Sequence, residues 1–175
     1  MTLIALKGHH SLCVLTLILL NIMHTMGQSL VKNYTHIVFS TKHRQPFITD
    51  EIELELFSYI GGICNRLDCQ VVLVGGYKDH VHILCLLSKK MTLAKLMEEV
   101  KGHSSRWIKT KGPEYRNFYW QNGYGAFSVY SKDVDRVVQY IRSQREHHSG
   151  QSFQDEYKSM LIENEMDFDE KFVWD

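Results

Sequence analysis

The chain has 175 residues, of which 44% are hydrophobic and 23% charged, and this ordinary composition suits one globular domain with a buried core. It contains no repeats or low-complexity segments, which excludes fibrous and solenoid proteins. The net charge of zero hides an asymmetry, because residues 26–150 carry 17 Lys and Arg against 12 Asp and Glu, whereas residues 151–175 carry 2 against 8. A basic body with an acidic tail favours a polyanionic partner, with ordinary solvated charge as the alternative.

The first 25 residues differ in character from the rest. A mostly apolar run from Leu12 to Leu20, preceded by Lys7, is typical of a secretory signal. No small-residue cleavage site follows, however, and the run is too short to span a bilayer. We therefore expect residues 1–25 to be an upstream extension outside the fold, with Met26 as the working start and a signal peptide as the alternative.

The four cysteines show no Cys-x-x-Cys pair. Two of them, Cys64 and Cys85, fall at apolar positions of predicted elements. This pattern indicates free thiols in a reducing compartment. We expect a cytoplasmic protein with no membrane segment.

Alternating and helical apolar patterns predict a domain over residues 26–150. Strands are expected near 34–39, 70–74, 80–87 and 126–130, and helices begin after Asp50 and Thr92. Asp50 and Glu53 have the spacing of a capping box, and residues 75–79 are expected to turn the second strand back into the third. The order βαββαβ predicts an α+β, ferredoxin-like antiparallel sheet with these two helices on one face.

A third helix is expected after Asp133, and an acidic tail, residues 151–175, follows it. The helix carries Tyr140 and Gln144, which are four residues apart and so lie one above the other on one helical face. Its apolar stripe should face the sheet and consists of Val134, Val137, Val138 and Ile141. In the tail, apolar side chains at helical spacing and later aromatics predict packing on the domain or on a partner subunit; these are Phe153, Tyr157, Leu161, Phe168, Phe172 and Trp174.

Two histidines stand at the entry of the most apolar strand. Period-two geometry puts His80 and His82 on the same face of that strand. Two imidazoles so placed can bind one metal ion, provided that a third ligand arrives from elsewhere. The alternatives are two strand histidines bonded to neighbours and, for Tyr140, an ordinary half-buried helix tyrosine.

Basic residues gather on the loop after the first strand and on the second helix. They are Lys42, Arg44, Lys95, Lys101, Arg106 and Lys109. With the aromatic residues nearby, these cations could hold and stack single-stranded DNA. The alternative is a solvated helix face.

Together these features resemble the transposases of the insertion-sequence 200/605 type, which are single-tyrosine members of the HUH nucleases. The resemblance covers the chain from about Met26 to its end. It rests on His80-Val81-His82, on residues 120–129 (WQNGYGAFSV), on residues 140–144 (YIRSQ) and on His147-His148. One departure is His43, where family members often carry an aromatic residue at a position that is not catalytic.

The resemblance implies a DNA transposase in which Tyr140 is the nucleophile and His80, His82 and Gln144 hold a divalent metal ion, Mg²⁺ or Mn²⁺. Such enzymes cut and rejoin single strands through a 5′-phosphotyrosine link and recognise hairpins near the element ends. The link keeps the bond energy, so no nucleotide cofactor is expected. The resemblance also implies a homodimer in which Tyr140 of one subunit meets the histidines of the other. A phenol has a pKa of about 10, so its attack needs a nearby cation or base.

Two other functions remain open from the sequence. One is a related HUH nuclease that has been domesticated to process chromosomal hairpins. The other is a non-catalytic nucleic-acid-binding module on the same fold, which would stack bases on sheet aromatics. In that case the histidines, Tyr140 and Gln144 would be incidental.

Overall fold

The computed structural model describes residues 28–147, 150, 152–171 and 173–174. The chain divides into two units, Met1–Val31 and Lys32–Asp175, and all the described helices and strands belong to the second. The apolar run from Leu12 to Leu20 lies outside the described residues. Among the residues that are described, no helix is long and apolar enough to cross a membrane.

Four antiparallel strands form one sheet in the order β2-β3-β1-β4. Their bounds are β1 Tyr34–Ser40, β2 Gln70–Tyr77, β3 His80–Leu86 and β4 Gly125–Val129. With helix α2 (Glu53–Arg66) between β1 and β2, and α3 (Leu93–Ile108) between β3 and β4, the chain follows the βαββαβ order. The predicted ferredoxin-like α+β fold is confirmed.

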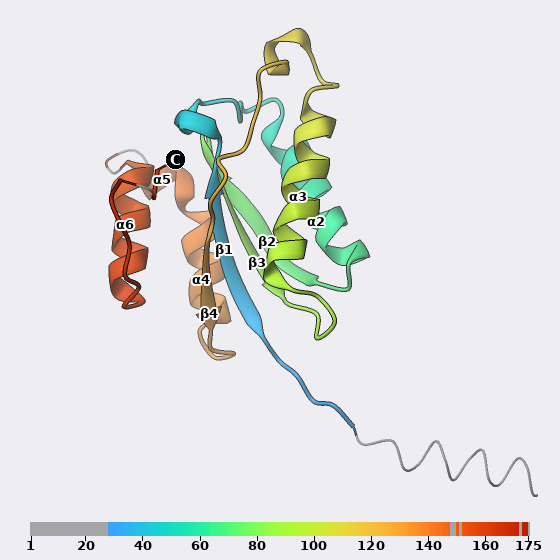
Figure 1. Ribbon diagram of the computed structural model, residues 1–175, viewed down its shortest axis with the longest axis vertical. Helices are drawn as coiled ribbons and strands as arrows, with labels where there is room; N and C mark the ends of the chain where they lie inside the picture. Colours follow the sequence, from blue (N-terminus) through green and yellow to red (C-terminus); the bar gives the residue numbers. More distant parts are fainter. Residues whose placement is uncertain (1–27, 148–149, 151, 172, 175) are drawn as a thin grey trace, which may run out of the picture. The chain divides into compact units, whose positions relative to one another are not determined.

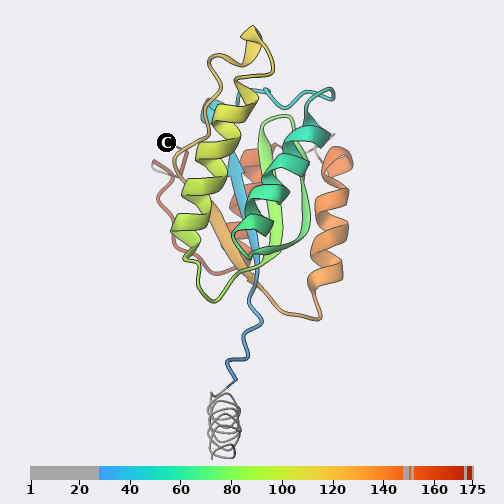
Figure 2. The ribbon, with the colours of Figure 1, turned by 90° about the vertical axis from the view of Figure 1, so that its right-hand side faces the viewer.

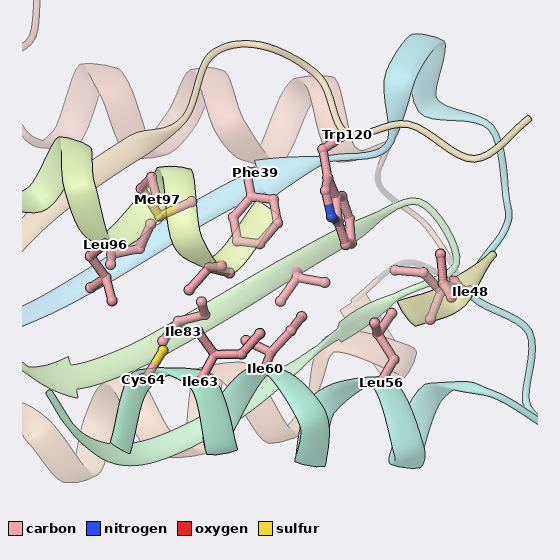
Figure 3. Close-up of a cluster of buried hydrophobic side chains, with 14 of the residues drawn as sticks. Phe39, Ile48, Leu56, Ile60, Ile63, Cys64, Ile83, Leu96, Met97 and Trp120 are labelled. Atoms are coloured by element: carbon pink, nitrogen blue, oxygen red, sulfur yellow. The ribbon is translucent and has the colours of Figure 1, made fainter. Parts of the chain in front are cut away.

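Helices α2 and α3 cover one face of this sheet (Figures 1 and 2). The main hydrophobic core lies between the two layers, as Figure 3 shows for Phe39 and Ile83 of the sheet against Ile60 and Leu96 of the helices. Alternation along β3 sends Val81, Ile83 and Cys85 into this core. The neighbouring residues His80, His82 and Leu84 therefore face the opposite side of the sheet.

The opposite face is covered by the C-terminal helices α4 (Val134–Arg142) and α6 (Phe153–Glu163), which lie across the sheet from α2 and α3 in Figure 1. A second core forms there from Val38 and Phe127 of the sheet and apolar residues of the tail. These are Phe153, Tyr157, Met160 and Leu161, with Phe168 and Trp174 packed against them. The acidic tail thus packs on its own domain; Phe172 lies outside the described residues.

Helix starts differ partly from the predictions. Thr92 caps α3 as predicted, since its hydroxyl accepts the Lys95 backbone N–H at 3.2 Å. The capping box at Asp50 and Glu53 is wrong, because α2 begins at Glu53 without a side-chain cap. Both carboxylates instead accept hydrogen bonds from Arg145, at 2.9 and 2.5 Å. The carboxylates that the local spacing assigned to the cap are thus paired with Arg145, which is distant in sequence.

Two further local predictions need correction. Strand β2 continues through Tyr77, so the turn into β3 is only Lys78-Asp79 rather than residues 75–79. Asp133 occupies the residue before α4 but makes no capping bond; its carboxylate lies 3.6 Å from Arg136. Pairing with β3 extends β2 past its local turn signal, whereas the Asp133 carboxylate pairs with a cation three residues along the same segment.

The cysteines that the structure describes are free and buried; they are Cys64, Cys69 and Cys85. Burial raises the pKa of the Cys64 and Cys85 thiols to about 12. These thiols are protonated core groups rather than reactive ones. Cys13 lies outside the described residues.

Candidate active site

Both histidines of β3 are fully buried on the face that α6 covers. Antiparallel pairing sets His80 between Ser40 of β1 and Tyr77 of β2, and it sets His82 between Val38 and Gly75. The Phe153 ring of α6 stacks on His80 with ring centroids 4.6 Å apart. The pairing of β3 on both sides and the stacked Phe153 ring together hold the imidazoles in position.

Each histidine has a neighbour on its Nδ1 atom. The Asp79 carboxylate lies 2.7 Å from Nδ1 of His80, and Nε2 of His36 lies 3.0 Å from Nδ1 of His82. Burial lowers the pKa of His36 to about 4, so its ring is neutral and can accept a hydrogen bond. When both Nδ1 atoms carry the proton, both Nε2 lone pairs are available to an ion. Partners of this kind orient the histidine ligands of metal sites.

Tyr140 and Gln144 meet the histidines from the end of α4. The expected single helix is wrong in detail, since α4 ends at Arg142 and a short helix α5 (Gln144–His147) begins after Ser143. The Ser143 hydroxyl donates to the carbonyls of Gln139 and Tyr140, which accompanies this break. The Gln144 side chain still turns inward, with 1% exposure, and its Oε1 lies 2.9 Å from Nε2 of His80.

A glycine lets α4 approach the sheet closely. A side chain on Gly75 of β2 would place its Cβ 2.6 Å from Cγ2 of Ile141. Ile141 is the fully buried member of the predicted α4 stripe, whereas Val134, Val137 and Val138 are half-buried. Gly75 also pairs with His82 across the strands, so this contact sets α4 beside the histidines.

Glu156 of α6 reaches the same point and is 4% exposed. Its Oε1 accepts a hydrogen bond from the Tyr140 hydroxyl and another, of 2.7 Å, from the Gln144 amide. Its carboxylate oxygens lie 3.6 Å from Nε2 of His82 and 3.7 Å from Nε2 of His80. All four residues predicted for the site therefore lie around one carboxylate that was not predicted.

The donor set fits a divalent ion. One atom each from His80, His82 and Glu156 lie within 4.8 Å of one another. Two imidazole nitrogens, a carboxylate and the Gln144 amide oxygen suit Mn²⁺, while Mg²⁺ favours the oxygen donors. A buried carboxylate would also gain a counter-charge from such an ion.

Tyr140 also borders a cavity of about 520 Å³ between β4, α4 and α6. His36, Phe127 and Glu156 line it with the phenol, and Arg136 and Glu163 stand at its edge. Burial and the Glu156 carboxylate raise the pKa of the Tyr140 phenol above its ordinary value. The phenol is therefore protonated in the free protein and borders this cavity.

The predicted DNA-binding cations have different surroundings. Lys101 donates to three backbone carbonyls of residues 121–123, at 2.7, 3.1 and 2.6 Å, and holds that loop. Lys95 lies between Glu98 and Glu99. Lys42 and Arg106 are exposed, Lys109 lies 3.8 Å above the Tyr119 ring, and Arg44 lies over Trp174. The exposed members are therefore the stronger candidates for phosphate contacts.

Sequence reasoning missed Glu156 and His36. Glu156 falls on the buried stripe of α6, between Phe153 and Met160, and a carboxylate on an apolar stripe is a signal of a buried site. His36 shares its strand face with Val38, but the pairing that brings it to His82 is not readable from sequence. The side chains of His147 and His148 lie outside the described part of the chain.

The comparisons with known proteins agree on one family. Residues 29–144 match the family model "Transposase IS200 like". The chain is 28% identical over 116 residues to the transposase for insertion sequence element IS200 of Salmonella typhimurium strain LT2, covering 63% of this chain and 76% of that protein. The corresponding Salmonella typhi transposase matches to the same extent.

Solved structures support the fold. A crystal structure assigned as a transposase from Deinococcus radiodurans R1 matches with a TM-score of 0.53 and 22% identity, over 69% of this chain and 97% of that one. A REP-associated tyrosine transposase bound to a REP hairpin matches with a TM-score of 0.51 and 14% identity, over 70% of this chain and 73% of that one.

Proposed function

Because the chain belongs to the IS200-like transposase family, we propose that it cuts and rejoins single-stranded DNA through a 5′-phosphotyrosine link on Tyr140. One observation carries this proposal. The Tyr140 hydroxyl lies in a buried group with two strand histidines, an amide and a carboxylate. A core tyrosine does not need such neighbours, whereas a phosphoryl-transfer nucleophile does.

We assign the metal to the Nε2 atoms of His80 and His82 and to the amide oxygen of Gln144. A bound Mn²⁺ or Mg²⁺ polarises the scissile phosphate and offsets the charge that develops on it. Asp79 and His36 keep the two rings oriented for this task. Gln144 follows Tyr140 by four residues, so the proposed ligand and nucleophile lie close together at the junction of α4 and α5.

The cavity beside Tyr140 provides the route for the strand. Its volume of about 520 Å³ suits a nucleotide of a single strand rather than paired bases. Tyr130, which lines the cavity and is exposed, offers a ring on which a base can stack. This is the physical reason to expect a single-stranded substrate.

Hairpin ends are the substrate that we propose. A structural neighbour has a REP hairpin bound, and the exposed cations Lys42 and Arg106, with the half-buried Lys109, offer this chain phosphate contacts. Lys109 over the Tyr119 ring pairs a cation with an aromatic face that is 53% exposed. Phosphate contacts would hold the hairpin stem while the single strand enters the cavity.

A homodimer is the assembly that we propose. In one chain Tyr140 lies beside its own His82, with ring centroids 5.9 Å apart. The same contacts can form between two subunits if α4 crosses to the partner. Mixing Tyr140→Phe with His82→Ala protein tests this, since only shared sites would then contain both intact parts. Recovered cleavage supports sharing, and none places each site in a single chain.

The function is tested by cleavage of a labelled single strand that carries a hairpin end. We expect products with Mn²⁺ or Mg²⁺, none with a chelator, and none for His82→Ala. His103→Ala is the matched control, because His103 is a partly exposed histidine of α3 paired with Glu99. Hairpin binding by His82→Ala should persist, since phosphate contacts supply most affinity. Binding without any cleavage by the wild type would instead support a non-catalytic binding module.

A further inference from the structure

Glu156 lies outside the part of the chain that matches the family. The match covers residues 29–144, whereas Glu156 belongs to α6, Phe153–Glu163. Yet its side chain is 4% exposed and touches the predicted nucleophile directly. A buried carboxylate costs free energy unless it is paired or used, so its place on an otherwise apolar stripe needs an account.

We propose that Glu156 is the catalytic base that accepts the phenolic proton of Tyr140. This assignment rests on the proposed function and adds a residue to it. The Tyr140 hydroxyl donates its hydrogen bond to Oε1 of Glu156, so the proton already points at the group that is to receive it. Geometry of this kind is the first requirement for a general base.

The neighbouring groups are less suited to this role. His36 and His82 are bonded to each other through ring nitrogens 3.0 Å apart, and both rings meet Tyr140 edge-on. The Gln144 amide donates 2.7 Å to Oε1 of Glu156, which holds the carboxylate in place.

The step balances without another reactant. The Tyr140 oxygen forms a bond to phosphorus while its proton passes to Glu156, which becomes a carboxylic acid. The bond from phosphorus to the 3′ oxygen breaks, and the electron pair leaves with that oxygen, which takes a proton from water. In the reverse step, Glu156 returns the proton to the phenol as the strand is rejoined.

The test separates proton transfer from metal binding. Glu156→Gln keeps the shape of the side chain but cannot take the proton, and we expect the rate of adduct formation to fall by about 10²–10⁴-fold. Replacing Tyr140 with a fluorinated tyrosine that is ionised at neutral pH should recover at least tenfold of this loss in the Glu156→Gln protein. A structural or metal-binding role would give no such recovery. Glu98→Gln is the control, because Glu98 is an exposed carboxylate of α3, on the other face of the sheet.

Glu156→Asp provides a second variant that keeps a carboxylate if the amide disturbs folding, and it should keep more adduct formation than Glu156→Gln. An unimpaired Glu156→Gln protein, or a loss that the fluorinated tyrosine does not reduce, overturns the assignment. Absence of any adduct in the wild-type protein with Mn²⁺ and hairpin DNA overturns the proposed function and Glu156's role with it. If the wild-type protein forms the adduct, a failure of the Glu156 assignment can be told apart from a failure of the proposed function.

Discussion

The protons on two Nδ1 atoms decide what His80 and His82 can do. Asp79 and His36 occupy those positions, at 2.7 and 3.0 Å, and leave the Nε2 atoms directed toward Glu156. A strand pattern can predict that the two rings share a face, but it cannot predict their tautomers. The orientation comes from Asp79, the last residue of the turn, and from a neighbouring strand.

Asp79→Asn tests this role at the level of one residue. The neutral amide oxygen accepts the Nδ1 hydrogen more weakly than a carboxylate does, so we expect Mn²⁺ affinity to fall by about 10–100-fold in calorimetric titration. Asp68→Asn is the control, because Asp68 has a φ of +57° in the turn before β2, a conformation that asparagine also tolerates. Equal Mn²⁺ affinity in wild type and Asp79→Asn would contradict the role.

The site residues fall into two groups: those that sequence patterns identify and those that only contacts between distant segments identify. His80, His82, Tyr140 and Gln144 were singled out because short spacings and the family resemblance mark them. Glu156 and His36 were missed because their roles depend on contacts between segments far apart in the chain, α6 with β3 and β1 with β3. Tertiary pairing supplies what local patterns lack.

At the scale of elements, the sheet and its two crossover helices were predictable and their ends were not. Alternation and helical stripes gave the βαββαβ order, because they reflect which face is buried. The Asp50 cap failed because Arg145, distant in sequence, pairs with that carboxylate. The prediction that Tyr140 and Gln144 lie on one continuous helix was wrong. The helix is interrupted at Ser143, whose hydroxyl donates hydrogen bonds to backbone carbonyls of α4.

Gly75→Ala tests how the sheet positions α4. The new methyl would meet Cγ2 of Ile141 at 2.6 Å and its carbonyl at 3.4 Å, so we expect a loss of about 1–3 kcal/mol in urea unfolding and slower adduct formation. Gly62→Ala is the control, since nothing lies within 4 Å and the helical position favours alanine by about 0.5–1 kcal/mol. A Gly75→Ala protein with wild-type stability and rate would show that α4 is held in another way.

At the scale of the molecule, the acidic and basic parts of the chain have different roles. The acidic tail lies on the histidine face, where it supplies Glu156, while exposed cations remain elsewhere on the domain. We therefore propose that exposed cations such as Lys42 and Arg106 contact DNA while the acidic tail serves the site. Composition predicted the asymmetry, and only the fold shows where the acidic part packs.

Salt dependence tests this division. Hairpin affinity should fall steeply with salt, and Lys109→Gln should reduce the slope of log affinity against log salt by about 0.7–0.9, because one phosphate contact is lost. Lys95→Gln is the control, since its ammonium lies 3.0 and 2.8 Å from Glu98 and Glu99. Equal slopes for Lys109→Gln and wild type in fluorescence anisotropy would remove Lys109 from the interface.

The most direct measurement is the identity of the residue that becomes linked to DNA. After reaction with hairpin DNA and Mn²⁺, nuclease and trypsin digestion should leave a nucleotide on the peptide of residues 137–142 (VVQYIR), whose single tyrosine is Tyr140. Mass spectrometry should find this mass in the wild type and not in Tyr140→Phe. A nucleotide on the peptide of residues 117–132, which holds Tyr119, Tyr124 and Tyr130, would contradict the account.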